Sequence, residues 1–383
     1  MKIKTIKQVK NLAGKTVLVR VDFNVPVKSG KVVENFRIKK SLPTIEYLLQ
    51  KQAKIILVSH LGRPKDKEKE LSLKPIAKEL EKLLDKKINF VELKKYKNVN
   101  ADITLLENIR YYQGEENNEG TLAKDLSVLA DIFVMDGFAV AHRGSASVSG
   151  IAKYLPAYAG LLVAEEIKCL LQATEKPSKP LVLILGGIKC ETKIPVLKKL
   201  LPQANQILIG GGIVNTYLWS KGYAVGQSVV DKDFKKEILK ICANKKVILP
   251  VDLVVGDYAG KNYQVLKVDK NFKVKKDQAI LSIGPQTVQM YSQYIKKAST
   301  LILNGALGYF EQPPYHYATF AISRLFANRS KGKAFGVAGG GETVQVLKDL
   351  KVDAQVDLLS TGGGAMLEFL SGKKLPGIEI LRI

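Results

Sequence analysis

The sequence has few cysteines and no long hydrophobic run. Its three cysteines, Cys169, Cys190 and Cys242, are widely spaced, so they indicate neither a disulfide framework nor a metal site and favour a reducing compartment. No apolar run approaches the ~20 residues of a membrane helix. The charged N-terminal stretch lacks the apolar core of a signal peptide. We therefore expect a cytoplasmic protein without a membrane segment.

Several catalytic signatures are also missing. His60, His142 and His316 do not form the spacing of a zinc site. No G-x-S-x-G elbow is present, and nothing in the sequence nominates a serine or cysteine nucleophile.

The standard nucleotide-binding motifs fail as well. Gly14-Lys15-Thr16 matches only the end of a P-loop, because Val9 stands where the first glycine belongs. A dinucleotide fingerprint starting at Gly210 ends on Asn215 instead of glycine. Protein-kinase motifs are absent too. Any bound nucleotide must therefore be held by another kind of scaffold.

The net charge is strongly positive, at +24 from 60 lysines and arginines against 36 acidic residues. This charge is compatible with nucleic-acid binding, with a solvated lysine-rich surface, or with attraction of a highly anionic small substrate. Lysines that alternate with glutamates, as in KELEKLLDKK (78–87), favour the solvated surface for most of them. The scarcer arginines call for a separate explanation.

Apolar runs alternate with helix-like segments along the whole chain. Continuous Val/Ile/Leu runs are typical of strands buried on both faces, and hence of parallel sheets. We expect strands in the runs 15–23, 53–62, 101–108, 131–138, 179–187, 205–212, 245–252, 299–308, 333–341 and 354–364. The pattern predicts a doubly wound α/β fold, and 383 residues favour two domains.

A domain boundary is expected where a long helix-like segment (159–180) ends in Pro-Ser-Lys-Pro. We assign residues 1–155 to a first domain, 156–178 to an interdomain helix and hinge, and 179–368 to a second domain. The tail, 369–383, lacks a helical period and is expected to return to the first domain.

Glycine clusters end four strands of the second half: Gly186–Gly187, Gly210–Gly212, Gly339–Gly341 and Gly362–Gly364. Ligands of open α/β sheets bind outside the carboxyl ends of the strands. A glycine turn that leads into a helix presents backbone N–H groups to phosphate. One cluster alone could be a tight turn, but four in one domain favour a nucleotide site.

Charged residues near these glycines have two interpretations. If a helix begins near Gly187, Lys189 and Lys193 share one face. Two cations there oppose the helix dipole, so a nearby anion would explain them, although plain surface lysines remain the alternative. Glu342 either stabilises its helix through the dipole or faces the Mg²⁺ of a bound nucleotide.

The first half carries its charged side chains after the apolar runs. Asp22 and Asn24 share one face at the end of run 15–23, by the period of two. Arginine forks match phosphate and carboxylate groups. The candidate cations are Arg37, Arg63, Arg110 and Arg143, together with His60. They predict a pocket for a small, multiply anionic substrate, and hence direct transfer between two bound ligands.

The chain resembles the phosphoglycerate kinase family along nearly its whole length. The matching motifs are RVDFNVP (20–26), SHLGRP (59–64), LLENIR (105–110), AHR (141–143), LGGxK (185–189), IGGG (209–212), LPVD (249–252), NGxxGxFE (304–311), GGGET (339–343) and STGGGA (360–365). Their combination and order are specific to that family.

The resemblance implies two Rossmann-like domains joined by a long helix and hinge. It also implies reversible, in-line phosphoryl transfer from 1,3-bisphosphoglycerate to Mg-ADP after domain closure, giving 3-phosphoglycerate and Mg-ATP. Mg²⁺ is the implied cofactor and a monomer the implied state, with no membrane or specific nucleic-acid partner.

The same resemblance implies the site residues. Phosphoglycerate would contact Asp22, Phe23, Asn24, Arg37, His60, Leu61, Gly62, Arg63, Arg110 and Arg143. The nucleotide would contact Gly186, Gly187, Lys189, Lys193, Gly210, Gly211, Asn304, Glu311, Gly340, Gly341, Glu342 and Thr343. Lys193 and Arg37 would stabilise the transferred group with support from Lys189, and Glu342 would bind Mg²⁺.

The chain departs from the family pattern at a few positions. Gly144 and Ser145 replace an Ala-His pair, and Glu342 replaces an aspartate. Smaller differences fall in 136–139, 186–193 and 304–308. None removes a phosphate-binding arginine or the key lysine.

Two rival functions remain open at this stage. A nicotinamide-dependent dehydrogenase would need a G-x-G-x-x-G motif followed by an acidic residue ~20 positions on, which is absent. A nucleic-acid-binding protein would be favoured by aromatic residues interleaved on a basic face, which the sequence does not show.

Overall fold

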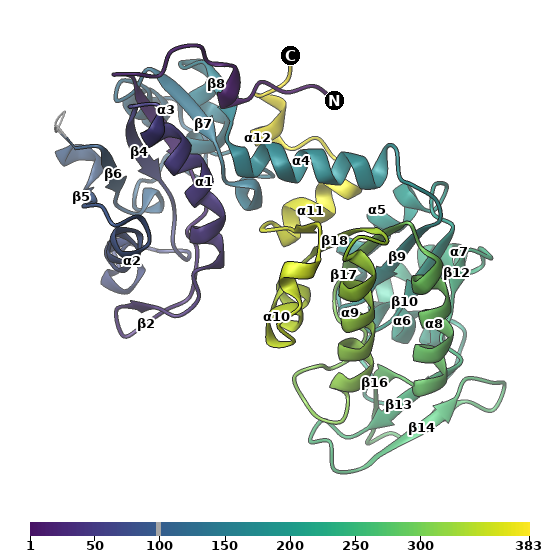
Figure 1. The fold of residues 1–383 in the computed structure, drawn as a ribbon. Coiled ribbons are helices and arrows are strands. Elements are labelled where there is room, and N and C mark those ends of the chain that lie inside the picture. Colours follow the sequence, from purple (N-terminus) through teal and green to yellow (C-terminus); the bar gives the residue numbers. More distant parts are fainter. Residues whose placement is uncertain (97–100) are drawn as a thin grey trace. The chain divides into compact units, whose positions relative to one another are not determined.

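The computed structural model describes residues 1–96 and 101–383, which form two compact units (Figure 1). The first unit comprises Met1–Lys168 and Lys374–Ile383, and the second comprises Cys169–Lys373. Helix α4 (Leu161–Thr174) carries the chain from one unit into the next. The functional limits drawn from the sequence, at 155, 178 and 368, stay a prediction.

The first unit is built on a six-stranded parallel sheet. Its strands in spatial order are β5 (Asn89–Val91), β6 (Ile103–Leu106), β4 (Lys54–Val58), β1 (Thr16–Arg20), β7 (Ile132–Met135) and β8 (Ala157–Ala159). The accompanying elements are α1 (Phe36–Gln50), α2 (Lys74–Leu84), α3 (Gly120–Ser127), α12 (Pro376–Glu379) and the hairpin β2 (Val27–Lys28) and β3 (Lys31–Val32).

The core of this unit follows from the apolar runs. Val17 and Val19 of β1 and Ile55 of β4 are buried, and they pack in one cluster with Ile38 and Ile45 of α1. Burying such side chains contributes roughly 1.5–3 kcal/mol each. The cluster holds the carboxyl ends of the central strands in fixed positions.

The second unit repeats this plan with another six-stranded parallel sheet. Its strands in spatial order are β12 (Val247–Ile248), β10 (Gln206–Ile209), β9 (Leu181–Leu185), β17 (Thr300–Asn304), β18 (Phe335–Gly339) and β19 (Leu358–Leu359). Its helices are α5 (Cys190–Leu200), α6 (Gly212–Ser220), α7 (Lys235–Cys242), α8 (Pro285–Lys297), α9 (His316–Ser330), α10 (Gly341–Asp349) and α11 (Gly363–Leu370).

These two sheets confirm the predicted α/β class, and each of the ten apolar runs contains one of their strands. Strands β5 and β8 were not predicted, because three residues are too few to show a pattern. The second unit also has an antiparallel sheet that the sequence analysis missed. It comprises β14 (Tyr263–Lys267), β13 (Asp252–Gly256) and β16 (Ala279–Ile283), beside the short pair β11 (Ala224–Val225) and β15 (Lys273–Val274).

The C-terminal segment Lys374–Ile383 belongs to the first unit, whereas residues 369–373 of the predicted tail fall in the second. Gly377 N–H donates to Ala141 O at 2.9 Å, and Lys4 N–H donates to Leu381 O at 2.8 Å. The expectation of no helix in the tail was wrong for α12, which begins at Pro376. Proline at the first helical position is favoured because its missing N–H would have no helical partner there.

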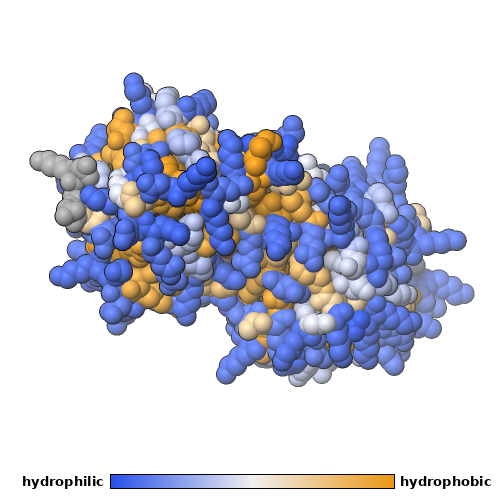
Figure 2. All heavy atoms as spheres, turned by 45° about the horizontal axis from the view of Figure 1, so that its top comes forward, coloured by the Kyte–Doolittle hydropathy of each residue, from blue (hydrophilic) through white to orange (hydrophobic). Residues whose placement is uncertain are grey.

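The face of the molecule drawn in Figure 2 is mostly hydrophilic. Lysines such as Lys74, Lys78 and Lys86 are exposed, as the solvated-surface interpretation of the net charge predicts. No helix in the described ranges has the length and apolar character needed to cross a bilayer.

Candidate active site

The predicted polar residues of the first unit follow the carboxyl ends of its central strands. Asp22 follows β1, His60 follows β4, Arg110 follows β6 and Arg143 follows β7. Because these strands are neighbours in a parallel sheet, their ends meet at one edge. The fold therefore brings together residues that are far apart in the sequence.

Asp22 and Asn24 hold the first helix against this edge. Arg37, in the first turn of α1, pairs with Asp22 Oδ2 through Nη1 at 2.8 Å, and the same nitrogen donates to Asn24 O at 3.1 Å. Asn24 Oδ1 accepts from Gly62 N–H at 3.0 Å. These contacts orient Arg37, whose side chain is still about one-third exposed, at 32%.

Arg20, which the sequence analysis missed, is buried at the end of β1 with 2% exposure. Its Nη1 donates to Val58 O at 3.2 Å, and its Nη2 lies 3.9 Å from Glu115 Oε1. No hydrogen-bond partner for Nε lies within residues 1–96 or 101–383. Burial lowers the pKa of Arg20. An arginine inside an apolar strand run was the sequence signal, since arginine is almost never fully buried unless paired.

His60 is neutral in this environment. Burial, followed by the charges of Arg20 and Arg110, holds the pKa of His60 well below its usual value. Arg20 Nη2 lies 3.4 Å from His60 Nδ1. Arginine can only donate, so Nδ1 accepts and the ring proton resides on Nε2. His60 can thus donate one hydrogen bond through Nε2.

A cavity of about 350 Å³ lies beside these groups. It is lined by Arg20, Arg63, Arg110, Glu115, Glu116, Arg143, Gly144 and Ser145. Arg63 is exposed, whereas Arg143 is half-buried with a buried Nε that has no partner in the described part of the chain. Four guanidinium groups around one cavity suit a phosphate or carboxylate ligand.

Two of the residues predicted to contact the substrate have side chains that do not line this cavity. Phe23 and Leu61 are buried in the hydrophobic core, so only their backbones are available to a ligand. Gly62 adopts a positive φ of 62°. Its carbonyl oxygen accepts a hydrogen bond from Arg110 Nη1, so Gly62 holds an arginine in place.

In the second unit, several glycines are required by close backbone packing. A Cβ at Gly186 would overlap the carbonyl oxygen of Ala306, and one at Gly305 would overlap the carbonyl of Gly186. A Cβ at Gly212 would meet the backbone of Ile188. These glycines let the loops after β9, β10 and β17 touch directly.

The three glycines at 339–341 serve three different purposes. Gly339 leaves room for the sulfur of Met366, and Gly340 adopts a φ of +101°. Gly341 begins α10, and no described heavy atom would lie within 4 Å of a Cβ there. Of these three glycines, Gly341 alone leaves open space at the start of a helix.

Lys193 lies on α5 and is buried, with its Nζ donating to Asn304 Oδ1. Asn304 in turn donates through Nδ2 to Gly339 O at 2.7 Å. Burial lowers the pKa of Lys193 to about 8, against the opposing effect of Glu342. Lys189 is exposed and precedes α5 in extended conformation. The idea that both lysines share a helical face was therefore wrong.

Glu342 and Thr343 connect α10 to the loop after β17. Glu342 Oε2 accepts from Ala306 N–H at 3.1 Å, and Thr343 Oγ1 accepts from Gly305 N–H at 2.8 Å. Within residues 1–96 and 101–383, no group of three or more His, Cys, Asp or Glu side chains is placed to hold a metal. Glu342 stands as a single carboxylate near a buried lysine.

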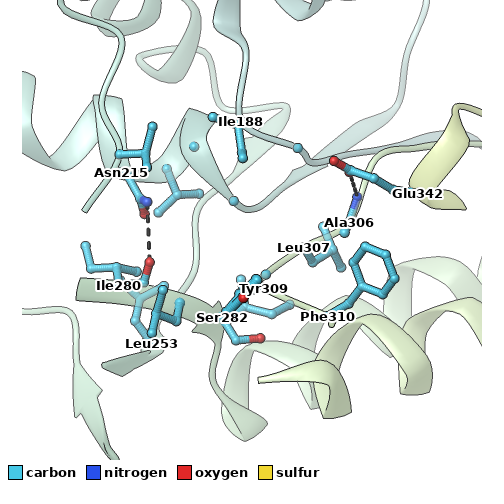
Figure 3. Close-up of a pocket in the computed structure, with 18 of the residues that line it drawn as sticks. Ile188, Asn215, Leu253, Ile280, Ser282, Ala306, Leu307, Tyr309, Phe310 and Glu342 are labelled. Carbon is cyan, nitrogen blue, oxygen red and sulfur yellow. Dashed lines mark hydrogen bonds between the residues drawn. The ribbon is translucent and has the colours of Figure 1, made fainter. Parts of the chain in front are cut away.

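An apolar pocket of about 160 Å³ lies beyond the glycine loops (Figure 3). Leu253, Ile280 and Leu281, from the unpredicted antiparallel sheet, form one side, and Leu307 and Phe310 contribute from the loop after β17. Four predicted residues line it, namely Gly187, Gly211, Glu311 and Glu342. Its walls suit a flat, largely apolar group such as a nucleobase.

Transfer of a charged group from a nucleotide needs cations at one ligand and backbone N–H groups at the other. The cationic cavity of the first unit and the glycine loops of the second meet these needs. By class, the chain is an α/β phosphotransferase.

The comparisons with known proteins agree. The family model "Phosphoglycerate kinase" matches residues 6–373, so the chain belongs to the phosphoglycerate kinase family. It is 41% identical to a phosphoglycerate kinase of Francisella tularensis, covering 100% of this chain and 99% of the relative. It is 42% identical to a phosphoglycerate kinase of Dictyoglomus turgidum, and the match covers 97% of this chain and 96% of the relative.

Solved structures give the same result. The phosphoglycerate kinase of Coxiella burnetii superposes with a TM-score of 0.88 at 38% identity, covering 99% of this chain and 98% of that one. The phosphoglycerate kinase of Pyrococcus horikoshii superposes with a TM-score of 0.85 at 29% identity, with the same coverage of both chains. The predicted resemblance is confirmed, and the chain catalyses reversible phosphoryl transfer between 1,3-bisphosphoglycerate and ADP.

Proposed function

We propose that the cationic cavity of the first unit binds phosphoglycerate and that the glycine-walled pocket of the second binds the nucleotide. The observation that carries this proposal is the cavity lined by Arg20, Arg63, Arg110 and Arg143. A trianionic ligand such as 3-phosphoglycerate matches this concentration of guanidinium groups. His60 donates its Nε2 proton to the same ligand, and Arg37 is held ready by Asp22.

Lys193 is the proposed cation for the transferred group. Its burial strengthens its interaction with a developing negative charge, because the surroundings exclude water. In the proposal, Asn304 orients the ammonium group and Arg37 assists it from the acceptor side. Lys189 is exposed and reaches a phosphate only as a flexible support.

The proposed cofactor is Mg²⁺ bound together with ATP or ADP. A single carboxylate fits this ion, because Mg²⁺ in kinases takes most of its ligands from phosphates and water. Glu342 would hold it, with the N–H groups at the start of α10 directed to the phosphates. When bound, the ion neutralises charge on the phosphates. Glu342 meanwhile keeps Lys193 charged by opposing the effect of burial.

The chemistry needs no general base. In the direction of ATP use the acceptor is a carboxylate, which is ionised at neutral pH because its pKa lies near ~4. The side chains therefore act by positioning and by neutralising charge. Domain closure, a cytoplasmic location and a monomeric state complete the proposal as expectations from the family.

The proposal is tested by measuring ADP release from Mg-ATP with and without 3-phosphoglycerate, while the 1,3-bisphosphoglycerate product is trapped continuously. We expect release that depends on 3-phosphoglycerate and falls by at least about 100-fold in Lys193→Ala, the scale for one electrostatic donor. Arg63→Ala should raise KM for 3-phosphoglycerate but not for ATP. Equal activity of Lys193→Ala would contradict the assigned role.

A further inference from the structure

Two adjacent glutamates line the cationic cavity but are held in opposite ways. Glu115 is buried, with 2% exposure. Glu116 is exposed, with 64% of its side-chain surface accessible to solvent. A cavity for anions would bind them more tightly without either carboxylate, so both need an explanation.

Glu115 is fixed by several hydrogen bonds. Its Oε1 accepts from the hydroxyls of Ser145 at 2.9 Å and Ser147 at 2.6 Å, and its Oε2 accepts from Ser147 N–H at 2.9 Å. Ala146 N–H donates to the carbonyl of Glu115 at 3.0 Å. This carboxylate joins two loops and supplies the nearest negative charge to Arg20. It is part of the permanent structure.

Glu116 makes a different kind of contact. Its Oε1 lies 3.2 Å from Arg110 Nε, whose side chain is only 6% exposed. Arg110 Nη1 already donates to the carbonyl of Gly62. Glu116 occupies the edge of the guanidinium that includes Nε. A phosphate or carboxylate that binds Arg110 in bidentate fashion through this edge must take it from Glu116.

The surroundings explain why a counter-ion is useful. Arg110 shares the cavity with Arg20 and Arg143, and burial together with Arg143 lowers the pKa of Arg110. A negative charge offsets this repulsion while no ligand is present. Because Glu116 is exposed, its carboxylate returns to water at little cost when it is displaced.

We propose that Glu116 is an internal counter-ion that occupies Arg110 in the ligand-free site and is displaced by the anionic group of the substrate. This inference rests on the proposed binding of phosphoglycerate in this cavity. Glu116 therefore weakens the binding of phosphoglycerate and raises its KM. The opposite role, in which Glu116 positions Arg110 for the substrate, predicts the opposite sign.

The test compares three variants of the same loop, in each of which one glutamate is replaced by glutamine. Glu116→Gln should lower KM for 3-phosphoglycerate about two- to five-fold, the range for an exposed ion pair, with kcat within about two-fold. Glu119→Gln removes an equal charge from the loop without contacting Arg110 and should leave KM unchanged. Glu115→Gln should raise KM, because it weakens the support of Arg20 and Ser145.

A second measurement assigns the effect to Arg110. Isothermal calorimetry with 3-phosphoglycerate should show tighter binding by Glu116→Gln than by the parent, and no such gain when Arg110 is also changed to Ala. An unchanged or raised KM for Glu116→Gln, or an equal drop for Glu119→Gln, overturns the proposal. If Arg110→Ala alone leaves 3-phosphoglycerate affinity unchanged, the proposed binding cavity fails, and the counter-ion role fails with it.

Discussion

Lys193 is the buried cation of the second unit, and its charge depends on its surroundings. Desolvation lowers its pKa to about 8, so the ammonium form is present below this pH and is lost above it. Bound phosphates favour the charged form. The alkaline limit should therefore be visible in the ligand-free enzyme.

We predict that kcat/KM for Mg-ATP falls above pH 8, because this parameter reports the free enzyme. Lys193→Arg should remove the alkaline limb of the profile, since arginine keeps its charge over the whole pH range. The plateau value of kcat/KM should be lower, because the guanidinium group is larger and fits the site of the ammonium group poorly. The check is a pH profile from about 6.5 to 9.5. A limb that persists in Lys193→Arg would assign it to another group.

Ser145 stands where the family commonly has histidine, and it has a structural task. Its hydroxyl donates to the buried carboxylate of Glu115 at 2.9 Å. Gly144, beside it, is exposed, and a Cβ there would meet only Pro376 at 4.0 Å.

We predict that Ser145→Ala lowers the free energy of unfolding by about 1.5–3 kcal/mol, the range for a hydrogen bond to a charged group. Gly144→Ala should change it by less than about 0.5 kcal/mol, as for a surface substitution without contacts. Urea denaturation of both variants provides the measurement. Equal effects would mean that the contact to Glu115 is not the reason for the serine.

At the scale of elements, a buried acid that follows β7 holds the start of α4. Asp136 Oδ1 accepts from Leu162 N–H at 3.1 Å, and burial raises the pKa of Asp136 to about 7, with Glu166 adding to the shift. Because the folded-state pKa of Asp136 lies above the unfolded one, the contribution of its protonated form to the free energy of unfolding is fully present at low pH. This contribution is lost as pH rises from about 4 to about 7.

Asp136→Asn should therefore gain stability relative to the parent as pH rises from 5 to 8, because Asn keeps an acceptor for Leu162 N–H without the buried charge. Thermal unfolding at pH 5 and pH 8 measures the difference. Asp125→Asn, on the exposed face of α3, is the matched control and should show no pH-dependent gain. A constant difference between Asp136→Asn and the parent at both pH values would refute the shifted pKa.

The glycine loops give a second prediction at this scale. Gly186→Ala should unfold or strongly destabilise the second unit, because its Cβ would overlap a backbone oxygen that cannot move aside. Gly341→Ala should preserve the melting temperature but raise KM for ATP, because the methyl group enters open space before α10. Thermal melting and nucleotide KM distinguish the two. Loss of stability in Gly341→Ala would show that its space is structural.

At the scale of the whole molecule, the charge of +24 is spread over exposed lysines, with arginines concentrated around the cavity of the first unit. Such a field attracts anionic substrates over a distance set by the ionic strength. It raises encounter rates without defining specificity.

We predict that KM for 3-phosphoglycerate rises several-fold between 50 and 300 mM salt, because screening shortens the range of this attraction. Steady-state kinetics over that range, with a neutral osmolyte as control, measures the effect. Retention on DNA that survives ~200 mM salt would revive the nucleic-acid interpretation of the charge, since purely phosphate-driven contacts weaken steeply there.

The α/β class, ten of the twelve strands of the two parallel sheets and the family could be predicted from the sequence, because continuous apolar runs and ordered motifs are local patterns. The sequence also nominated Arg63, Arg110 and Arg143, which line the cavity. The folded structure was needed to show that Arg20 joins them, that Phe23 faces the core, and that Lys189 precedes its helix. It was also needed to show that Glu115 is a fixed support while Glu116 contacts Arg110. Burial and partner choice depend on which strand ends and loops meet in space, and a one-dimensional pattern does not contain that information.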